Sequence, residues 1–165
     1  MNKVSDSAII SLDLEELYPK ENEVVVFDLK DFLFMGLILK EKDFRESLKN
    51  LDINPYSGKY VAVTCSADAI IPMWAYMLVA TYLQPVAKNI FYGTLEETKN
   101  EILLANINQL NFEDYKDKRV VIKGCGEAPI SESAYLTATK LLRPLTKSIM
   151  YGEPCSTVPI FKKKD

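Results

Sequence analysis

The chain has 165 residues, of which 48% are hydrophobic and 26% charged, and its formal net charge is −3. This length and composition are typical of one globular domain that buries its own core without a metal ion or disulfides. The absence of histidine excludes a Ser-His-Asp triad, a Cys-His pair and a histidine-ligated zinc site within the chain, and the charge balance predicts no nucleic-acid partner.

The cysteines and the N-terminal segment indicate the compartment. Cys65, Cys125 and Cys155 are too few and too widely spaced for a disulfide scaffold, which favours a reducing environment. Residues 1–14 carry charges among short apolar stretches and lack the pattern of a signal peptide. The longest apolar helical stretch, 70–83, is shorter than the ~20 residues that cross a bilayer. We therefore expect a cytoplasmic protein without a membrane segment.

Short β-rich runs alternate with helical stretches along the chain. The expected strands, in order, are 24–29, 60–64, 89–92, 119–123 and 148–151. The expected helices are 37–51, 68–83, 95–110 and 131–143, with a capping box from Thr94 to Glu97 and an N-cap at Ser131. This alternation predicts one α/β domain over residues 1–165, with a mostly parallel sheet of about five strands and helices on both of its faces.

The chain also resembles itself. A gapless shift that places Ala75 on Ala134, here called the repeat offset, aligns 75–94 with 134–153, and 8 of the 20 aligned positions are identical. The agreement runs through the loop between helix and strand, where chance similarity is not expected to persist. The sequence therefore predicts two tandem βαβα-like repeats, approximately residues 31–94 and 90–153.

Each cysteine falls at or just beyond the end of a predicted strand. The self-alignment places Asp68 opposite Glu127, so each repeat has a cysteine near a strand end and an acidic residue close behind it. Ligands of open α/β sheets bind outside the carboxyl ends of the strands. We expect Cys65, Cys125 and Cys155 to gather at one sheet edge as a thiolate site for zinc or iron, or for sulfur transfer. Asp68, Glu127 or Glu153 would supply a fourth ligand.

Other interpretations of these residues stay open. Free cysteine also behaves as a small buried hydrophobe, and Asp68 and Glu127 also suit the N-termini of helices without any further role. A second hypothesis is an enzyme acting on a small anionic metabolite bound at helix N-termini. Cys65 would be its nucleophile, with Cys155 as the alternative, and Asp68 or Glu127 would be the general base.

A third hypothesis is a structural or oligomeric interaction module. Residues 70–83 are apolar on nearly every side, so they form either the central helix of the domain or a face through which Met73, Trp74 and Met77 meet another subunit in a homodimer. Lys162, Lys163 and Lys164 are interpreted as a solvated tail or, alternatively, a basic patch.

Three stretches resemble a known family. Residues 63–72 (VTCSADAIIP), 123–125 (KGC) and 148–159 (SIMYGEPCSTVP) are similar to the Bacteroidetes domain-of-unknown-function family number 2480, and the resemblance extends over nearly the whole chain. The family implies no established activity. It implies bacterial origin and, through neighbouring genes, partners among the iron–sulfur cluster assembly proteins, which favours thiolate or metal chemistry at the three cysteines.

Overall fold

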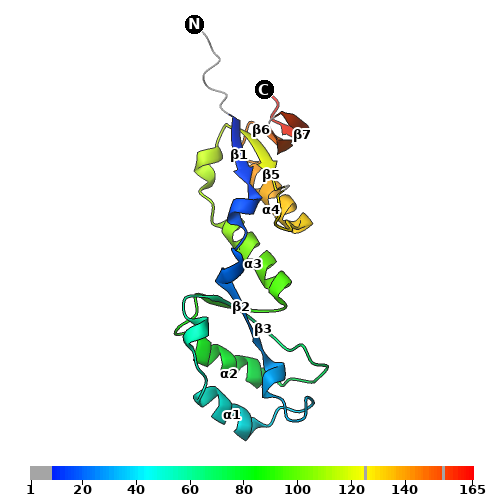
Figure 1. Cartoon of the computed structure of the whole chain (residues 1–165). Coiled ribbons are helices and arrows are strands. Elements are labelled where there is room, and N and C mark those ends of the chain that lie inside the picture. Colours follow the sequence, from blue (N-terminus) through cyan, green and yellow to red (C-terminus); the bar gives the residue numbers. More distant parts are fainter. Residues whose placement is uncertain (1–8, 125, 154) are drawn as a thin grey trace. The chain divides into compact units, whose positions relative to one another are not determined.

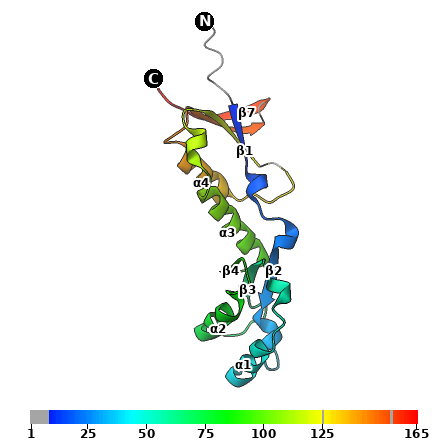
Figure 2. The ribbon, with the colours of Figure 1, turned by 90° about the vertical axis from the view of Figure 1, so that its left-hand side faces the viewer.

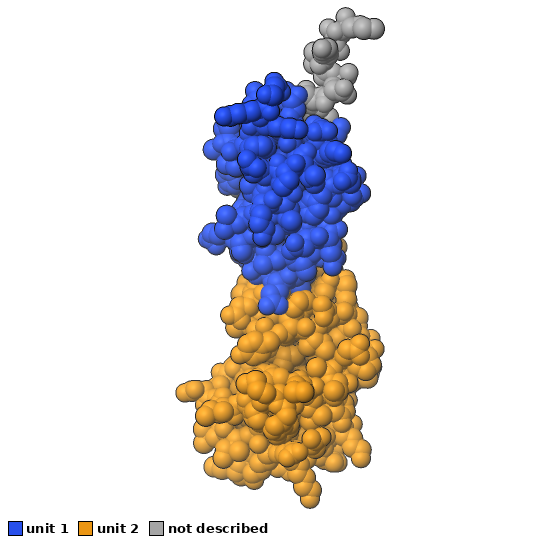
Figure 3. Space-filling view, turned by 180° about the vertical axis from the view of Figure 1, so that it is seen from behind, with its two compact units in different colours: residues 1–19, 100–165 blue, residues 20–99 orange. Residues whose placement is uncertain are grey.

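Parallel pairing between strands far apart in the sequence organises the chain into two units. The computed structural model describes residues 9–124, 126–153 and 155–165. Unit 1 comprises residues 1–19 and 100–165, and unit 2 comprises residues 20–99 (Figure 3). Unit 1 is therefore discontinuous in sequence, because the whole of unit 2 lies between its two segments.

Unit 2 contains a three-stranded parallel sheet in the order β2-β3-β4. Its strands and helices are β2 Val24–Asp28, α1 Glu41–Lys49, β3 Tyr60–Thr64, α2 Met73–Leu83 and β4 Asn89–Tyr92. The central strand, β3, is rich in small and β-branched residues, and Val61, Ala62 and Val63 are all buried. The helices α1 and α2 lie next to each other (Figures 1 and 2) and contribute Phe44, Leu48 and Val79 to the same core cluster.

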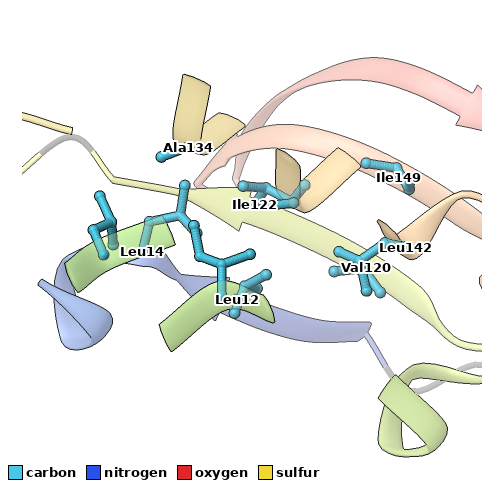
Figure 4. Close-up of a cluster of buried hydrophobic side chains, with 10 residues drawn as sticks. Leu12, Leu14, Val120, Ile122, Ala134, Leu142 and Ile149 are labelled. Carbon is cyan, nitrogen blue, oxygen red and sulfur yellow. The ribbon is translucent and has the colours of Figure 1, made fainter. Parts of the chain in front are cut away.

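Unit 1 contains a four-stranded sheet in the order β1-β5-β6-β7, parallel except for β7. Its strands and its helix α4 are β1 Ile9–Asp13, β5 Arg119–Lys123, α4 Glu132–Leu142, β6 Ser148–Glu153 and β7 Ser156–Lys162. The helix α3, Leu95–Asn108, includes the boundary between the units at residues 99 and 100. Side chains from β1, β5, β6 and α4 meet in the core of unit 1 (Figure 4).

Short 3-10 helices follow or precede several strands. They are η1 Leu14–Leu17, η2 Glu21–Glu23, η3 Leu29–Phe32, η4 Asn54–Tyr56 and η5 Phe112–Tyr115. Among the described residues, no helix is long and apolar enough to cross a membrane.

The predicted α/β class is confirmed, but the expected single sheet of about five strands is wrong. All five predicted strands and all four predicted helices form, whereas β1 and β7 were not predicted. The strand β7 contains Pro159, which an edge strand tolerates because one side of its backbone has no partner. The described residues thus form seven strands in two sheets. Alternating hydrophobicity identifies a strand but does not say which sheet the strand joins.

Both predicted helix starts are confirmed. The backbone N–H of Thr94 donates to Glu97 Oε2 at 2.9 Å, and the N–H of Glu97 donates to Thr94 Oγ1 at 3.2 Å, which is a complete capping box before α3. The Oγ of Ser131 accepts from the N–H of Ala134 at 3.3 Å at the start of α4. These contacts are local, and for that reason the sequence pattern was sufficient to predict them.

Elements of the two units recur at a constant spacing. The strand β3, the helix α2 and the strand β4 begin at residues 60, 73 and 89, and the repeat offset carries these starts onto residues 119, 132 and 148, where β5, α4 and β6 begin. The first strands are related differently. Ile9 of β1 pairs with Arg119 of β5, and Val24 of β2 pairs with Tyr60 of β3. Ile9 and Val24 therefore occupy equivalent positions, and β1 and β2 have the same register against the central strands of their sheets. The separation between Ile9 and Val24, here called the first-strand offset, is much shorter than the repeat offset.

The two buried clusters correspond position by position. Nine of the ten buried residues of the unit 2 cluster have a counterpart in the unit 1 cluster, seven at the repeat offset and two at the first-strand offset. The pairs are Phe27 and Leu12, Leu29 and Leu14, Phe44 and Leu103, Leu48 and Ile107, Val61 and Val120, Val63 and Ile122, Ala75 and Ala134, Val79 and Ala138, and Leu83 and Leu142.

The turn before the central strand is also matched. The N–H of Gly58 donates to Val86 O at 2.9 Å in unit 2, and the N–H of Asp117 donates to Leu145 O at 2.8 Å in unit 1. Both residues adopt a left-handed backbone, with φ of 69° at Gly58 and 58° at Asp117. Glycine adopts this conformation without cost, whereas aspartate only tolerates it.

We therefore expect opposite effects from exchanging the residue at this turn. Gly58→Ala should lower the free energy of unfolding by about 1 kcal/mol, because a Cβ disfavours positive φ. Asp117→Gly should leave the free energy of unfolding unchanged or raise it by up to about 1 kcal/mol, because glycine adopts a positive φ without the strain that aspartate carries there. Urea denaturation followed by circular dichroism measures both changes. A neutral Gly58→Ala variant would contradict the expectation.

Candidate functional site

The candidate site residues follow the central strand of each unit. Residues 65–72 connect β3 to α2 in unit 2, and residues 124–131 connect β5 to α4 in unit 1. The expectation that both loops share one sheet edge is wrong, because β3 and β5 belong to different sheets. The equal spacing of the strands reflects equivalent places in two sheets, not neighbouring places in one sheet.

In unit 2 the carboxylate of Asp28 holds the loop that follows β3. Asp28 Oδ1 accepts from the N–H of Ser66 at 3.0 Å, and Asp28 Oδ2 accepts from the Ser66 hydroxyl at 2.5 Å. The same Oδ1 accepts from the N–H of Lys30 at 3.0 Å and so caps η3. One carboxylate at the end of β2 thus joins two chain segments 38 residues apart.

These hydrogen bonds determine the pKa of Asp28. Burial alone raises the pKa of this carboxyl, but hydrogen bonds from the side chain and backbone of Ser66 and from the backbone of Lys30, together with the Lys30 charge, outweigh burial and lower it. Asp28 is therefore a structural acceptor held in its ionised form. A carboxylate with a lowered pKa that already accepts three hydrogen bonds is poorly suited to act as a general base.

In unit 1 the corresponding loop is held by Glu15, which lies in η1 directly after β1. Glu15 Oε1 accepts from the N–H of Glu127 at 2.8 Å and from the N–H of Ala128 at 3.0 Å. A Cβ at Gly126 would overlap the Glu15 carboxylate in its present position, so a larger residue there would displace this carboxylate from the loop. Both units thus hold the loop after the central strand with a carboxylate from near the end of the first strand.

A pair of tyrosines packs beside each loop. Tyr76 and Tyr92 meet edge to face in unit 2 with ring centroids 5.5 Å apart, and Tyr135 and Tyr151 do so in unit 1 at 5.8 Å. Burial, then the neighbouring Tyr92 and Cys65, raise the pKa of Tyr76. A tyrosine hydroxyl is protonated at neutral pH, and the raised pKa of Tyr76 extends this to higher pH.

The predicted thiol positions are only partly described. Cys65 is half-buried in unit 2, and its thiol donates to Ala67 O at 3.6 Å. Cys155 is exposed in unit 1, in the hairpin between β6 and β7. Cys125 lies outside the described residues, so a meeting of all three sulfurs stays a prediction.

The predicted acidic residues occupy three different settings. Asp68 is exposed in the loop after β3, and Glu127 is exposed in the loop after β5, where its backbone N–H is bound by Glu15. Glu153 lies 3.6 Å from Lys123 Nζ, between the ends of β5 and β6. Within the described residues, no three Cys, Asp or Glu side chains form a group that could hold a metal ion.

Asp28 and Glu15 are the residues that sequence reasoning missed. A signal exists in the sequence for Asp28: residues 12–17 (LDLEEL) and 27–32 (FDLKDF) share an aspartate, Asp13 or Asp28, that caps the 3-10 helix after it. Glu15 corresponds to Lys30 in this comparison, so the pattern gives no signal for Glu15. The repeat offset does not align these two stretches, because they are related by the first-strand offset.

We expect Asp28→Ala to lower the free energy of unfolding at neutral pH by about 1–2 kcal/mol, since it removes a cap and leaves the Ser66 N–H without its acceptor. The pKa of Asp28 is lowered on folding, so the stabilisation is present above the usual carboxyl pKa and is lost as the pH falls through the lowered value. Denaturation of wild type and variant between about pH 2 and pH 7 should therefore converge at the acid end.

Asp31→Ala is a matched control, because Asp31 is an exposed carboxylate on η3 that does not hold the loop. It should change stability by less than about 0.5 kcal/mol. Equal losses for the two variants at neutral pH would show that the bonds to Ser66 contribute nothing.

Comparison with known proteins places the chain in a family. Residues 1–163 match a family described as a protein of unknown function, DUF2480. A search of the curated proteins and a search of the solved structures each found no match. Because the match extends over nearly all of the 165 residues, the chain belongs to the DUF2480 family, whose function is not known.

Proposed function

We propose that this protein is an interaction module that assembles as a homodimer through unit 2, with α2 at the centre of the contact. The observation that carries this proposal is the exposure of large apolar side chains around the start of α2. Ile70 is 94% exposed, Met73 74% and Met77 69%. Met73 and Met77 lie four residues apart on one face of α2, and Ile70 lies in the loop just before the helix.

The proposal rests on a comparison between the units, which we infer to be copies of one βαβ unit. The constant repeat offset, the matched core positions and the matched turns support a duplication. The different offset of β1 and β2 supports insertion of one copy into the other, because the inserted copy separates β1 from the rest of its own sheet. This inferred arrangement differs from the simple tandem order expected from the sequence, which stays a prediction.

Surface positions that differ between the copies are not required by the shared fold. Met73 in unit 2 corresponds to Glu132 in unit 1, and Ile70 corresponds to Pro129. A charged residue is thus compatible with the first position of this helix. The apolar side chain of Met73 is therefore not required by the shared fold, whereas Met77 has an exposed apolar counterpart in Leu136.

The chemistry of α2 favours a second copy as the partner. The 11 residues of α2 (MWAYMLVATYL) include no charged side chain, so two copies of the helix can pack together without like-charge repulsion. Methionine side chains are flexible and adapt to one another across such a contact. Elsewhere in unit 2, the loop after η3 exposes four further apolar residues, namely Phe34, Met35, Leu37 and Ile38.

The double variant Met73→Glu/Met77→Glu tests the dimer. Met73 is in the first turn of α2, where glutamate is favourable, and Met77 is exposed, so the variant should fold, but carboxylates buried between two apolar helices cost several kcal/mol. Sedimentation at chain concentrations on the order of 50 µM should give a dimer for wild type and a monomer for the variant.

Leu136→Glu is the matched control, because Leu136 occupies the position of unit 1 that corresponds to Met77 and is 72% exposed. It should leave the dimer intact. A monomeric wild-type protein, or dissociation by Leu136→Glu as well, would contradict the proposal.

A second proposal concerns the thiols, and it is supported by the observation that Cys65 and Cys155 are free rather than joined in disulfides. Together with Cys125 they would bind zinc or iron, or pass sulfur to an iron–sulfur assembly partner. Metal analysis of anaerobically purified protein should then give about one ion per chain, and less in Cys125→Ser. A stoichiometry far below one in wild type would end this proposal.

A further inference from the structure

The amino-terminal edge of the unit 1 sheet carries a concentration of positive charge. Two hollows of about 570 and 630 Å³ lie there and share Lys163 and Lys164 in their walls. The other basic residues that line them are Lys116, Lys118, Arg143, Lys147 and Lys162. Asp117 and Asp165 are the acidic residues among the lining, so the hollows are strongly cationic although the whole chain is acidic.

Backbone pairing holds the central lysines in a row. The N–H of Lys147 donates to Lys118 O at 2.8 Å, and the N–H of Lys163 donates to Lys147 O at 2.9 Å. These three residues flank β5, β6 and β7, so their backbones are spaced as adjacent strands are, about 4.8 Å apart. The ion pairs among the described residues join Arg45 to Glu41 and Lys123 to Glu153, and neither pair includes a lysine of this row.

An apolar hollow adjoins this row. It has a volume of about 450 Å³, and Met150, Ile160 and Phe161 line it together with Lys147 and Lys162. Ile160 is 53% exposed. The guanidinium of Arg143 lies 4.7 Å from the centroid of the Phe161 ring, which brings charge and aromatic surface together. A ligand at this edge would therefore meet ammonium groups on one side and apolar surface on the other.

We propose that this edge of unit 1, here called the lysine edge, binds single-stranded nucleic acid. The lysines would neutralise successive phosphates of the backbone, and the bases would contact the apolar hollow beside them. Two cationic hollows with shared walls suit an extended chain of phosphates better than a single small anion. Such binding would not depend on the nucleotide sequence, because every base has an apolar face that can contact the hollow.

Unit 2 lacks an equivalent surface among its described residues. At the repeat offset, Lys59 and Lys88 correspond to Lys118 and Lys147, but Lys59 Nζ donates to Asn22 O at 2.7 Å and Lys88 Nζ lies 4.7 Å from the centroid of the Tyr60 ring. The additional lysines of unit 1 come from the end of β7 and the residues after it. The charge balance of the whole chain predicts no nucleic-acid partner, and the proposal departs from that expectation. A net charge of −3 does not show where on the surface the lysines gather.

Fluorescence anisotropy with a labelled single strand of about 20 nucleotides tests the proposal. Wild type should bind at about 50 mM salt, and Lys118→Ala/Lys147→Ala/Lys163→Ala should bind at least about tenfold more weakly. Three lost phosphate contacts should also reduce the slope of log affinity against log salt by about 2. The matched control Lys59→Ala/Lys88→Ala should bind as wild type does, and circular dichroism should confirm that both variants are folded.

Absence of binding by wild type, or equal weakening in the control variant, would overturn the proposal. Displacement of the oligonucleotide by poly-glutamate of equal charge at equal concentration would also overturn it, because the edge would then respond to negative charge alone. The Met73→Glu/Met77→Glu variant should still bind the oligonucleotide in the same assay at saturating protein. The dimer proposal and the nucleic-acid proposal can therefore fail independently of each other.

Discussion

The pairing of β1 with β5 is the constraint on which the rest of the structure depends. Ile9 to Asp13 run parallel to Arg119 to Lys123, so two segments separated by most of the chain must meet before the unit 1 sheet exists. The entropic cost of closing so long a loop grows only slowly with its length, and a compact unit 2 within the loop brings the two ends closer than an unfolded chain would. Insertion of one unit into the other is compatible with stability for this reason.

Equivalent cores with different surfaces are the second general feature. Val79 and Ala138, or Phe44 and Leu103, differ in size but remain apolar and buried, since each must fill the space between the sheet and its helices. Exposed positions are free of that requirement. Met73 in one unit and Glu132 in the other show how far they diverge, and the lysines at the end of β7 add a surface that unit 2 does not have. Comparison of the units therefore separates residues that build the fold from surface residues that the shared fold does not require.

The carboxylates near the ends of the first strands have a structural role. Asp28 and Glu15 each accept backbone N–H groups from the loop after the central strand, which fixes the loop that a ligand of an α/β sheet would approach. The thiol of Cys65 lies in one such loop, beside Tyr76. These two carboxylates are therefore committed to hydrogen bonds that maintain the loops.

The sequence alone determined the local elements. The runs that became β2 to β6, the four helices, the capping box at Thr94 and the N-cap at Ser131 depend on neighbours within a few residues, so their patterns are readable without a structure. The tertiary structure alone decided which sheet each strand joins, that β1 and the Pro159-containing β7 are strands, and that Lys118, Lys147 and Lys163 stand in a row. These features depend on pairing between distant segments, and hydrophobic periodicity carries no information about which distant segment a strand will meet.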